Sequence, residues 1–326
     1  ISANLEGSGT FNELSVKNFN IDYNNTSLKA NGVLKNLLDT EKMSFDLHVT
    51  DSYIDPTDPN KFLRELELPE YVEFGIIKID TLTYFGGPLE FKTTFAIRTD
   101  KGNLNGTANL NMRSPDMIYD ATLITSNLDI GPFTSISTDL NSEIKISGVG
   151  FDPQKMKFDL EMEGVSSRFG EKYFNNINII SNAENGLITT TLSLSSDSTS
   201  VDLLATLDFN NPYDPAYDIK GKLNGINLAK LLNNESLDSD INLTLDASGQ
   251  GFDPDSMDIF LVTDIQNSRF MDFDIDSTRL IMDVRRNDGR TKIINIISDI
   301  ADFTISGDFL ITTLGDVLSR EAEIIN

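Results

Sequence analysis

One spacing rule recurs three times in this chain and constrains its fold more than any other feature. An aromatic residue followed by Asp is answered, nine residues after the aromatic, by an aliphatic residue and then Asp or Asn. The three copies are Phe45-Asp46…Ile54-Asp55, Tyr119-Asp120…Leu128-Asp129 and Tyr217-Asp218…Ile226-Asn227. Self-similarity at a long period predicts a stacked repeat architecture, in which function usually lies on a surface that all repeats share.

A second repeat overlaps the first. The segment Ser147-Gly148-Val149-Gly150-Phe151-Asp152-Pro153 returns as Ser248-Gly249-Gln250-Gly251-Phe252-Asp253-Pro254, at an offset of 101. We therefore divide the chain into four approximate repeats, residues 1–57, 58–131, 132–232 and 233–326, within one continuous array. The chain starts at Ile1 without a basic leader, so we expect it to be a fragment of a longer protein.

The dominant local pattern is alternation with period two, which predicts strands with one buried and one wet face. In residues 201–209, for example, Val201, Leu203 and Leu207 alternate with acidic and hydroxylated residues. A sheet with one solvated face is typical of antiparallel proteins, so the expected fold class is all-β. Only a few short helices are expected, at Pro59 to Leu66, Leu228 to Leu232 and Leu314 to Ile324.

Composition excludes several classes of function. The chain has 26 basic and 51 acidic residues and a net charge of −25, which argues against binding nucleic acid or lying flat on an anionic membrane. It has no Cys, so thiolate catalysis, disulfides and Cys-based metal sites are excluded. No run of about 18 apolar residues could span a membrane. No cofactor is expected.

The repeated segments resemble the AsmA/TamB-like proteins of diderm bacteria, and TamB segments in particular. The resemblance rests on stretches such as Tyr217 to Leu232, followed by a strand and a Gly-x-Gly turn like Gly148-Val149-Gly150. It implies an elongated sheet curled into an open trough, the β-taco, whose apolar lining carries phospholipid between the inner and outer membranes. It also implies a periplasmic location, an inner-membrane anchor outside this chain and an Omp85-type barrel partner like TamA.

On this interpretation the chain is not an enzyme, and its working surface is the apolar phase of the strands. A second role implied by the family is outer-membrane protein assembly, in which exposed strand edges pair with client strands. The candidate lipid-groove residues are Phe158, Leu160, Met162, Leu192, Leu194, Val201, Leu203, Leu207, Phe209, Ile241, Leu243, Leu245, Ile259, Leu261, Phe303, Ile305 and Phe309.

Two alternatives stay open at this point. The first is an extracellular structural or adhesive repeat protein with a sealed core, because alternation says which face is buried and not what buries it. The second is an enzyme on a β-solenoid such as a polysaccharide lyase, which predicts a cluster of Asp, Arg and Lys on one face. The basic residues are too scattered in the sequence to suggest such a cluster.

The remaining polar signals favour structural readings. His48 lies on the polar phase of its strand, where a solvent-facing role is favoured over catalysis. Asp272, Asp274 and Asp276 alternate with apolar residues, which indicates a wet strand face and not a calcium loop. Arg168 and Arg269 recur in register, each before a Phe. We favour packing over phosphate binding for both.

Overall fold

The chain folds as an all-β protein, which confirms the expected fold class. The structure is a computed structural model that describes residues 1–58, 72–134, 136–232, 235–287, 291–299 and 301–313. Its nineteen strands belong to a single antiparallel sheet that is not closed. Three short helices lie wholly within these residues.

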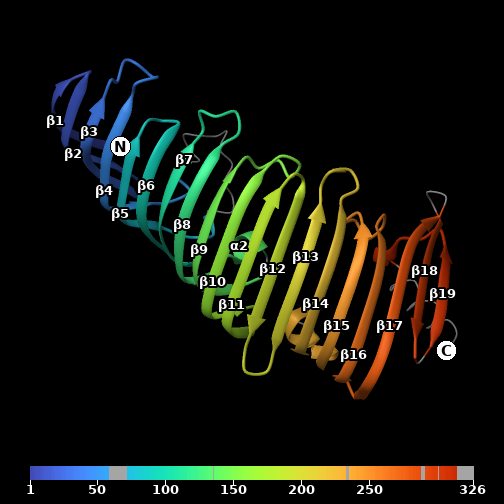
Figure 1. The fold of residues 1–326 in the computed structure, drawn as a ribbon. Coiled ribbons are helices and arrows are strands. Elements are labelled where there is room, and N and C mark those ends of the chain that lie inside the picture. Colours follow the sequence, from blue (N-terminus) through green and yellow to red (C-terminus); the bar gives the residue numbers. More distant parts are fainter. Residues whose placement is uncertain (59–71, 135, 233–234, 288–290, 300, 314–326) are drawn as a thin grey trace. The chain divides into compact units, whose positions relative to one another are not determined.

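The chain divides into two compact units, which are described separately. Unit 1 comprises Ile1–Phe151 and Lys157–Asn178, and unit 2 comprises Asp152–Met156 and Ile179–Asn326. The strand β11 (Lys172–Glu184) runs across the division. In the registered pairs of both units, each strand pairs with its neighbour in sequence, as in a meander (Figure 1).

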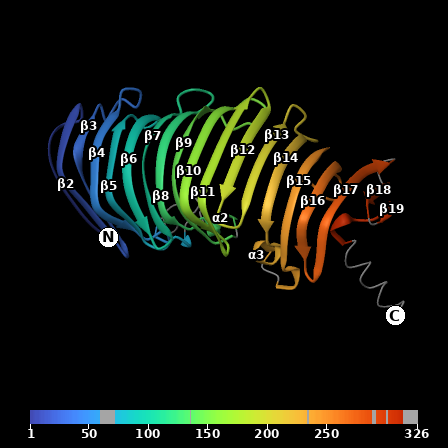
Figure 2. The same ribbon diagram turned by 60° about the horizontal axis from the view of Figure 1, so that its bottom comes forward.

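Unit 1 contains ten strands before β11, and its strands bend along their length (Figure 2). The strands are β1 (Ser2–Thr10), β2 (Glu13–Tyr23), β3 (Thr26–Lys35), β4 (Ser44–Ile54), β5 (Ile77–Gly86), β6 (Glu90–Thr99), β7 (Gly102–Asn111), β8 (Ile118–Leu128), β9 (Thr138–Val149) and β10 (Lys157–Phe169). The short helix α2 (Gly131–Thr134) lies in the loop between β8 and β9.

Unit 2 contains eight strands after β11. They are β12 (Leu187–Ser195), β13 (Ser200–Asp208), β14 (Ala216–Ile226), β15 (Ser239–Gln250), β16 (Asp258–Phe270), β17 (Phe273–Asn287), β18 (Thr291–Ser298) and β19 (Asp302–Gly307). The helix α3 (Leu228–Leu232) and the 3-10 helix η2 (Glu235–Leu237) lie between β14 and β15, at the end of these strands (Figure 2).

One of the three expected helices is confirmed. Leu228 to Leu232 forms α3 with the expected bounds. The helices expected at Pro59 to Leu66 and at Leu314 to Ile324 lie outside the described residues. The sequence did not predict α2, which is a single turn beginning at a Gly-Pro pair. Among the described residues, no helix has both the length and the apolar character needed to cross a membrane.

Cross-strand register keeps the apolar residues on one face in each unit, because directly opposed residues point to the same side of a sheet. In unit 1 one such row runs through Leu34, Phe45, Gly86, Phe91, Leu110, Tyr119, Gly148 and Phe158. In unit 2 the corresponding row runs through Leu207, Tyr217, Gly249, Ile259, Val284, Ile294 and Ile305.

Regularly placed β-bulges interrupt the ladders. Asp51, Ser166 and Asn267 have positive φ angles of 44°, 48° and 44°, and each precedes a buried serine. The serine hydroxyl replaces a lost ladder partner. Ser167 Oγ accepts the backbone N–H of Asn141 at 2.9 Å. A bulge bends its strand and increases the local twist, so these positions help to set the curvature of the sheet.

The other two copies of this bulge have the same chemistry. Ser52 Oγ accepts the backbone N–H of Lys29 at 2.8 Å, and Ser268 Oγ accepts that of Asn242 at 2.8 Å. Each serine also donates to a carbonyl two residues earlier in its own strand, as Ser268 does to Gln266. The bulge is therefore a repeated structural unit.

Candidate apolar ligand surface

We define the apolar face of unit 2 as the side chains of β12 to β19 that point to the same side of the sheet as the row from Leu207 to Ile305. Each residue of this face lies opposite another of the same face, as Leu192 lies opposite Leu203 and Leu203 opposite Gly221. Twelve of the seventeen candidate groove residues belong to its strands: Leu192, Leu194, Val201, Leu203, Leu207, Ile241, Leu243, Leu245, Ile259, Leu261, Phe303 and Ile305.

The other five candidates lie elsewhere. Phe209 and Phe309 follow the last residues of β13 and β19, so they belong to loops and not to strands. Phe158, Leu160 and Met162 lie on β10 of unit 1. There they are opposite Gly148, Ile146 and Ile144 of β9, on the apolar face of that unit.

The exposure of these side chains indicates how much apolar surface another molecule could cover. None of the seventeen is buried. Sixteen are half-buried and Phe303 is 48% exposed. In the described part of the chain only eleven apolar residues are buried. Residues of a sealed core would lose nearly all of their accessible surface, so this apolar face retains surface that another molecule could cover.

No second layer covers the face in the described part of either unit. Each strand packs extensively only against its neighbours in sequence, and α3 packs against η2 and β15. The half-burial therefore comes from adjacent side chains within the same sheet. Large exposed apolar surfaces are uncommon in soluble monomers and usually mark binding sites.

Aromatic residues of the recurring rule lie opposite glycines of the next strand. Phe45 lies opposite Gly86, Tyr119 opposite Gly148 and Tyr217 opposite Gly249. A Cβ on Gly148 would lie 2.6 Å from the hydroxyl oxygen of Tyr119. The glycine is therefore required because the ring occupies the space of its missing side chain.

The Phe of the following turn completes the arrangement. Phe151 stacks on Tyr119 with ring centroids 5.0 Å apart, and Phe252 stacks on Tyr217 at 5.9 Å. Burial raises the pKa of both tyrosines, and Asp258 also raises that of Tyr217. Gly150, with φ of 72°, forms the turn that carries Phe151. The Gly-x-Gly segment thus serves backbone geometry.

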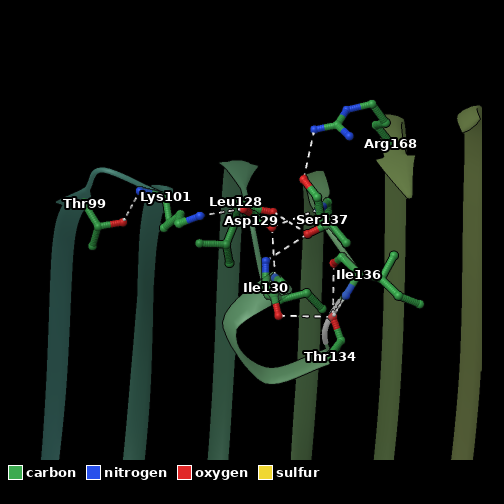
Figure 3. A network of polar contacts seen from close by, with 11 residues as sticks. Thr99, Lys101, Leu128, Asp129, Ile130, Thr134, Ile136, Ser137 and Arg168 are labelled. Atoms are coloured by element: carbon green, nitrogen blue, oxygen red, sulfur yellow. Dashed lines mark hydrogen bonds and ion pairs between the residues drawn. The ribbon is translucent and has the colours of Figure 1, made fainter. Parts of the chain in front are cut away.

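The Asp at the end of the recurring rule organises the loops at the opposite strand ends (Figure 3). Asp129 accepts the backbone N–H groups of Gly131 and Thr138, both at 2.9 Å, and the Lys101 ammonium at 3.0 Å. Burial raises the pKa of Asp129, but hydrogen bonds from Thr138, Gly131 and Lys101 outweigh it, so the pKa lies below its usual value. Asp129 is therefore a loop-closing carboxylate.

The recurring arginines are also structural. Arg168 donates to the Ser137 hydroxyl at 3.4 Å (Figure 3). It also donates to the carbonyl of Gly170. Arg269 donates to Asp238 and to the carbonyl of Met271, both at 3.0 Å. Each guanidinium ties its own hairpin turn to a neighbouring loop. This arrangement supports the packing interpretation over phosphate binding.

The sequence did not reveal a pair of cations on the apolar face of unit 2. Arg286 lies opposite Lys292 across β17 and β18. Lys292 is only 6% exposed, and its Nζ lies 3.7 Å from Asp255 without a hydrogen bond. Arg286 lies 3.4 Å from Asp258, beside a surface pocket of about 530 Å³. Hydrogen bonds from the Thr312 hydroxyl and N–H lower the pKa of Asp255.

The polar residues weighed in the sequence for catalysis or metal binding are exposed side chains. His48 is exposed on the polar phase of β4, 3.5 Å from Asp46, as expected for a solvent-facing strand residue. Asp272, Asp274 and Asp276 are all exposed at the start of β17. Among the described residues, no group of three or more His, Asp or Glu side chains is arranged to hold a metal ion.

Three comparisons, with protein-family models, with curated proteins and with solved structures, each find no match for this chain. Function is therefore inferred from the geometry of the apolar face.

Proposed function

We propose that the apolar faces of this chain hold the acyl chains of lipids and let them move along the strand array. The observation that carries the proposal is the half-burial of the candidate groove residues, which form cross-strand rows without a covering layer. Each methylene of an acyl chain buried on such a surface contributes about 0.8 kcal/mol. A single lipid can therefore be held by contact area alone.

The chemistry of the rows suits movement as well as binding. In unit 2 the row from Leu207 to Ile305 contains only apolar side chains, Tyr217 and Gly249. Apolar contact is non-directional, so an acyl chain that leaves one row of side chains finds equivalent contacts on the next row. Two charged residues of the described part of this face, Arg286 and Lys292, lie near the hairpin between β17 and β18.

The opposite face supports the same proposal. Its rows are predominantly acidic and hydroxylated. One row of unit 2 consists of Thr206, Asp218, Ser248, Phe260, Asp283, Asn295 and Thr304. The net charge of the whole chain is −25. A strongly acidic surface would keep an array with an uncovered apolar face soluble and would discourage self-association.

The wider role is proposed from the likeness of the repeated segments to AsmA/TamB-like proteins. We infer that the chain is a non-enzymatic segment of such a protein in the periplasm. Its sheet would curl into a trough for phospholipid transport between the inner and outer membranes. On this proposal the protein is anchored in the inner membrane and meets an Omp85-type barrel at the outer membrane.

The family likeness also carries a second proposed role, in outer-membrane protein assembly. An exposed strand edge presents backbone groups with which a client strand could pair. The sealed-core scaffold is less favoured, because the half-buried apolar rows would then need a covering layer.

Lipid retention tests the proposal. The purified protein is examined by native mass spectrometry and lipid extraction, together with Leu245→Asp on the apolar face. We expect bound phospholipid on the wild type and a strong loss in the variant, because a carboxylate is costly to desolvate beside acyl chains. Leu204→Asp is the matched control. Leu204 is 46% exposed and lies on the opposite face of the sheet, on β13, two strands away from Leu245 on β15. A wild-type protein without lipid would contradict the proposal.

A further inference from the structure

Five loops that join strands of unit 1 lie at the same end of these strands, because alternate turns of a meander share an end. They join β1 to β2, β3 to β4, β5 to β6, β7 to β8 and β9 to β10. Each carries one exposed large hydrophobic side chain, with exposed fractions between 40% and 80%. These side chains, here called the loop ledge, are Phe11, Leu38, Leu89, Met112 and Phe151. In the fifth loop, Phe151 belongs to unit 1 and residues 152–156 belong to unit 2.

Hydrogen bonds between neighbouring loops hold the ledge together. The loops therefore continue the sheet beyond its strands and present their apolar tips from a connected backbone. The bonds run from Leu37 N to Phe11 O at 2.9 Å, from Met112 N to Leu89 O at 2.7 Å, from Gly150 N to Met117 O at 2.8 Å and from Arg113 Nη2 to Glu41 O at 3.1 Å.

The opposite end of the same strands differs in composition. Its tight turns are polar: Asn24-Asn25 after β2, Asp100-Lys101 after β6 and Gly170-Glu171 after β10. The exceptions are the loop of α2, where Phe133 and Ile136 are exposed, and the described part of the loop between β4 and β5, where Val72 and Ile76 are exposed. Phe133 also packs on Phe74 with ring centroids 5.4 Å apart. In the described residues, every loop at one end of unit 1 has an exposed apolar tip, whereas the tight turns at the other end are polar.

Charge pairing indicates which partner the ledge fits. Lys42 lies 3.1 Å from Asp39, and Arg113 lies 3.7 Å from Glu90, the first residue of β6. Two acids in and beside the ledge loops are therefore each offset by a neighbouring cation. A second copy of the chain would meet it with a net charge of −25, which opposes association. A zwitterionic lipid surface has no net charge to repel.

We propose that the loop ledge docks on a zwitterionic phospholipid bilayer, with Phe11, Leu38, Leu89, Met112 and Phe151 entering the headgroup region. Side chains of this type gain free energy by leaving water for the lipid interface, and Met adapts readily to irregular surroundings. The inference goes beyond the proposed function, because docking does not require the apolar faces to hold lipid. It adds a place where the sheet would lie against its lipid source.

A single Trp tests this proposal cleanly, because the chain contains none. Leu38→Trp places the probe on the ledge, and Glu171→Trp places it in an exposed polar turn at the opposite strand ends. Vesicles of phosphatidylcholine with brominated acyl chains should shift the Leu38→Trp emission to the blue and quench it. Glu171→Trp should keep the emission of a solvated Trp.

A flotation assay provides the second measurement. Combining Phe11→Ser, Leu38→Ser and Leu89→Ser should weaken vesicle binding about tenfold or more, because apolar burial supplies the affinity. Phe273→Ser, at an exposed Phe of unit 2, should leave it unchanged. Equal quenching at both Trp positions, undiminished binding of the triple variant, or a blue shift without vesicles caused by self-association would overturn the proposal. Lipid extraction from the purified protein tests the apolar faces independently of the loop ledge.

Discussion

The two copies of the Tyr…Gly-x-Gly-Phe module, one in each unit, use the same packing with different charges. Tyr119 covers Gly148 and stacks on Phe151, and Tyr217 covers Gly249 and stacks on Phe252. The second copy adds Phe209, whose ring centroid lies 6.2 Å from that of Phe252. At this end of the strands, both copies keep the geometry that lets an aromatic ring cross a neighbouring backbone.

The opposite strand ends have diverged. Asp129 closes its loop with help from Lys101, whereas the equivalent Asn227 accepts from the Lys230 N–H at 3.1 Å and donates to Asp238. Charges vary between the copies while ring, glycine and bulge serine persist. Recurrence in this chain therefore marks residues that shape the sheet, and the function belongs to the face that they shape.

The largest effect on stability is expected when a methyl group is added to the glycine beneath the Tyr ring. Gly148→Ala and Gly249→Ala should each destabilise the fold by about 1–3 kcal/mol, because the new Cβ overlaps the Tyr hydroxyl and a backbone carbonyl. Urea denaturation measures the change. Gly249→Ala should cost more, because its Cβ would lie 2.2 Å from Asp258 O, against 2.5 Å from Lys157 O for Gly148.

Gly307→Ala is the control for this pair. Its nearest neighbour is Phe309 Cδ1, at 3.7 Å from the added Cβ. We expect a change within about 0.5 kcal/mol. Equal destabilisation by all three substitutions would show that the ring-over-glycine packing has no special role.

Removal of a bulge serine should have the next largest effect. Ser167→Ala and Ser268→Ala each leave a backbone N–H, of Asn141 or Asn242, without its acceptor. An unsatisfied buried donor costs about 1–3 kcal/mol, and the same cost in both units is expected because the geometry is the same. Thermal unfolding measures this cost. Ser8→Ala, on the exposed strand β1, is the control and should leave the unfolding temperature unchanged. A clear difference in cost between Ser167→Ala and Ser268→Ala would contradict the equivalence of the two bulges.

The smallest effect is expected at the diverged end. Asp129→Asn should cost about 1 kcal/mol at neutral pH, because Asn can still accept one N–H as Asn227 does. Lys101→Met should cost less than about 1 kcal/mol, because the ion pair is partly exposed. Stability measured in urea at pH 7 should rank the two variants in this order.

The pH dependence of the same carboxylate sharpens this prediction. The pKa of Asp129 is below its usual value in the folded state, so the unfolded chain takes up the proton first as pH falls. The stability that Asp129 contributes is therefore fully present above about pH 4 and is lost as the pH drops through the lowered folded pKa. The gap between wild type and Asp129→Asn should narrow in that window, and a gap independent of pH would contradict this role.

The sequence predicted the features that depend on local pattern. Alternation identified the all-β class, and the residues Leu228 to Leu232 formed a helix as expected. The recurrence of Gly148 and Gly249 is visible in the sequence, but the Tyr that requires each glycine is brought there by cross-strand pairing. That pairing depends on register across a loop of variable length, which local pattern does not specify.

Other features had no usable signal. Ser166 and Asn267 resemble ordinary wet strand residues, although their positive φ angles create bulges. Arg286 and Lys292 became neighbours only through the β17–β18 hairpin. The residues of the loop ledge are far apart in the sequence, and only the strand pairing brings their turns to one end of unit 1. Each case depends on contacts between strands, and a linear pattern does not contain them.

A photo-crosslinking amino acid at two adjacent positions tests the central claim most directly. Leu203 lies on the apolar face of unit 2, and Asp202 is exposed on the opposite face of the same strand. In living cells, a probe at Leu203 should capture phospholipid while a probe at Asp202 captures little. The absence of lipid at Leu203, or equal capture at both positions, would contradict the claim that this face holds acyl chains.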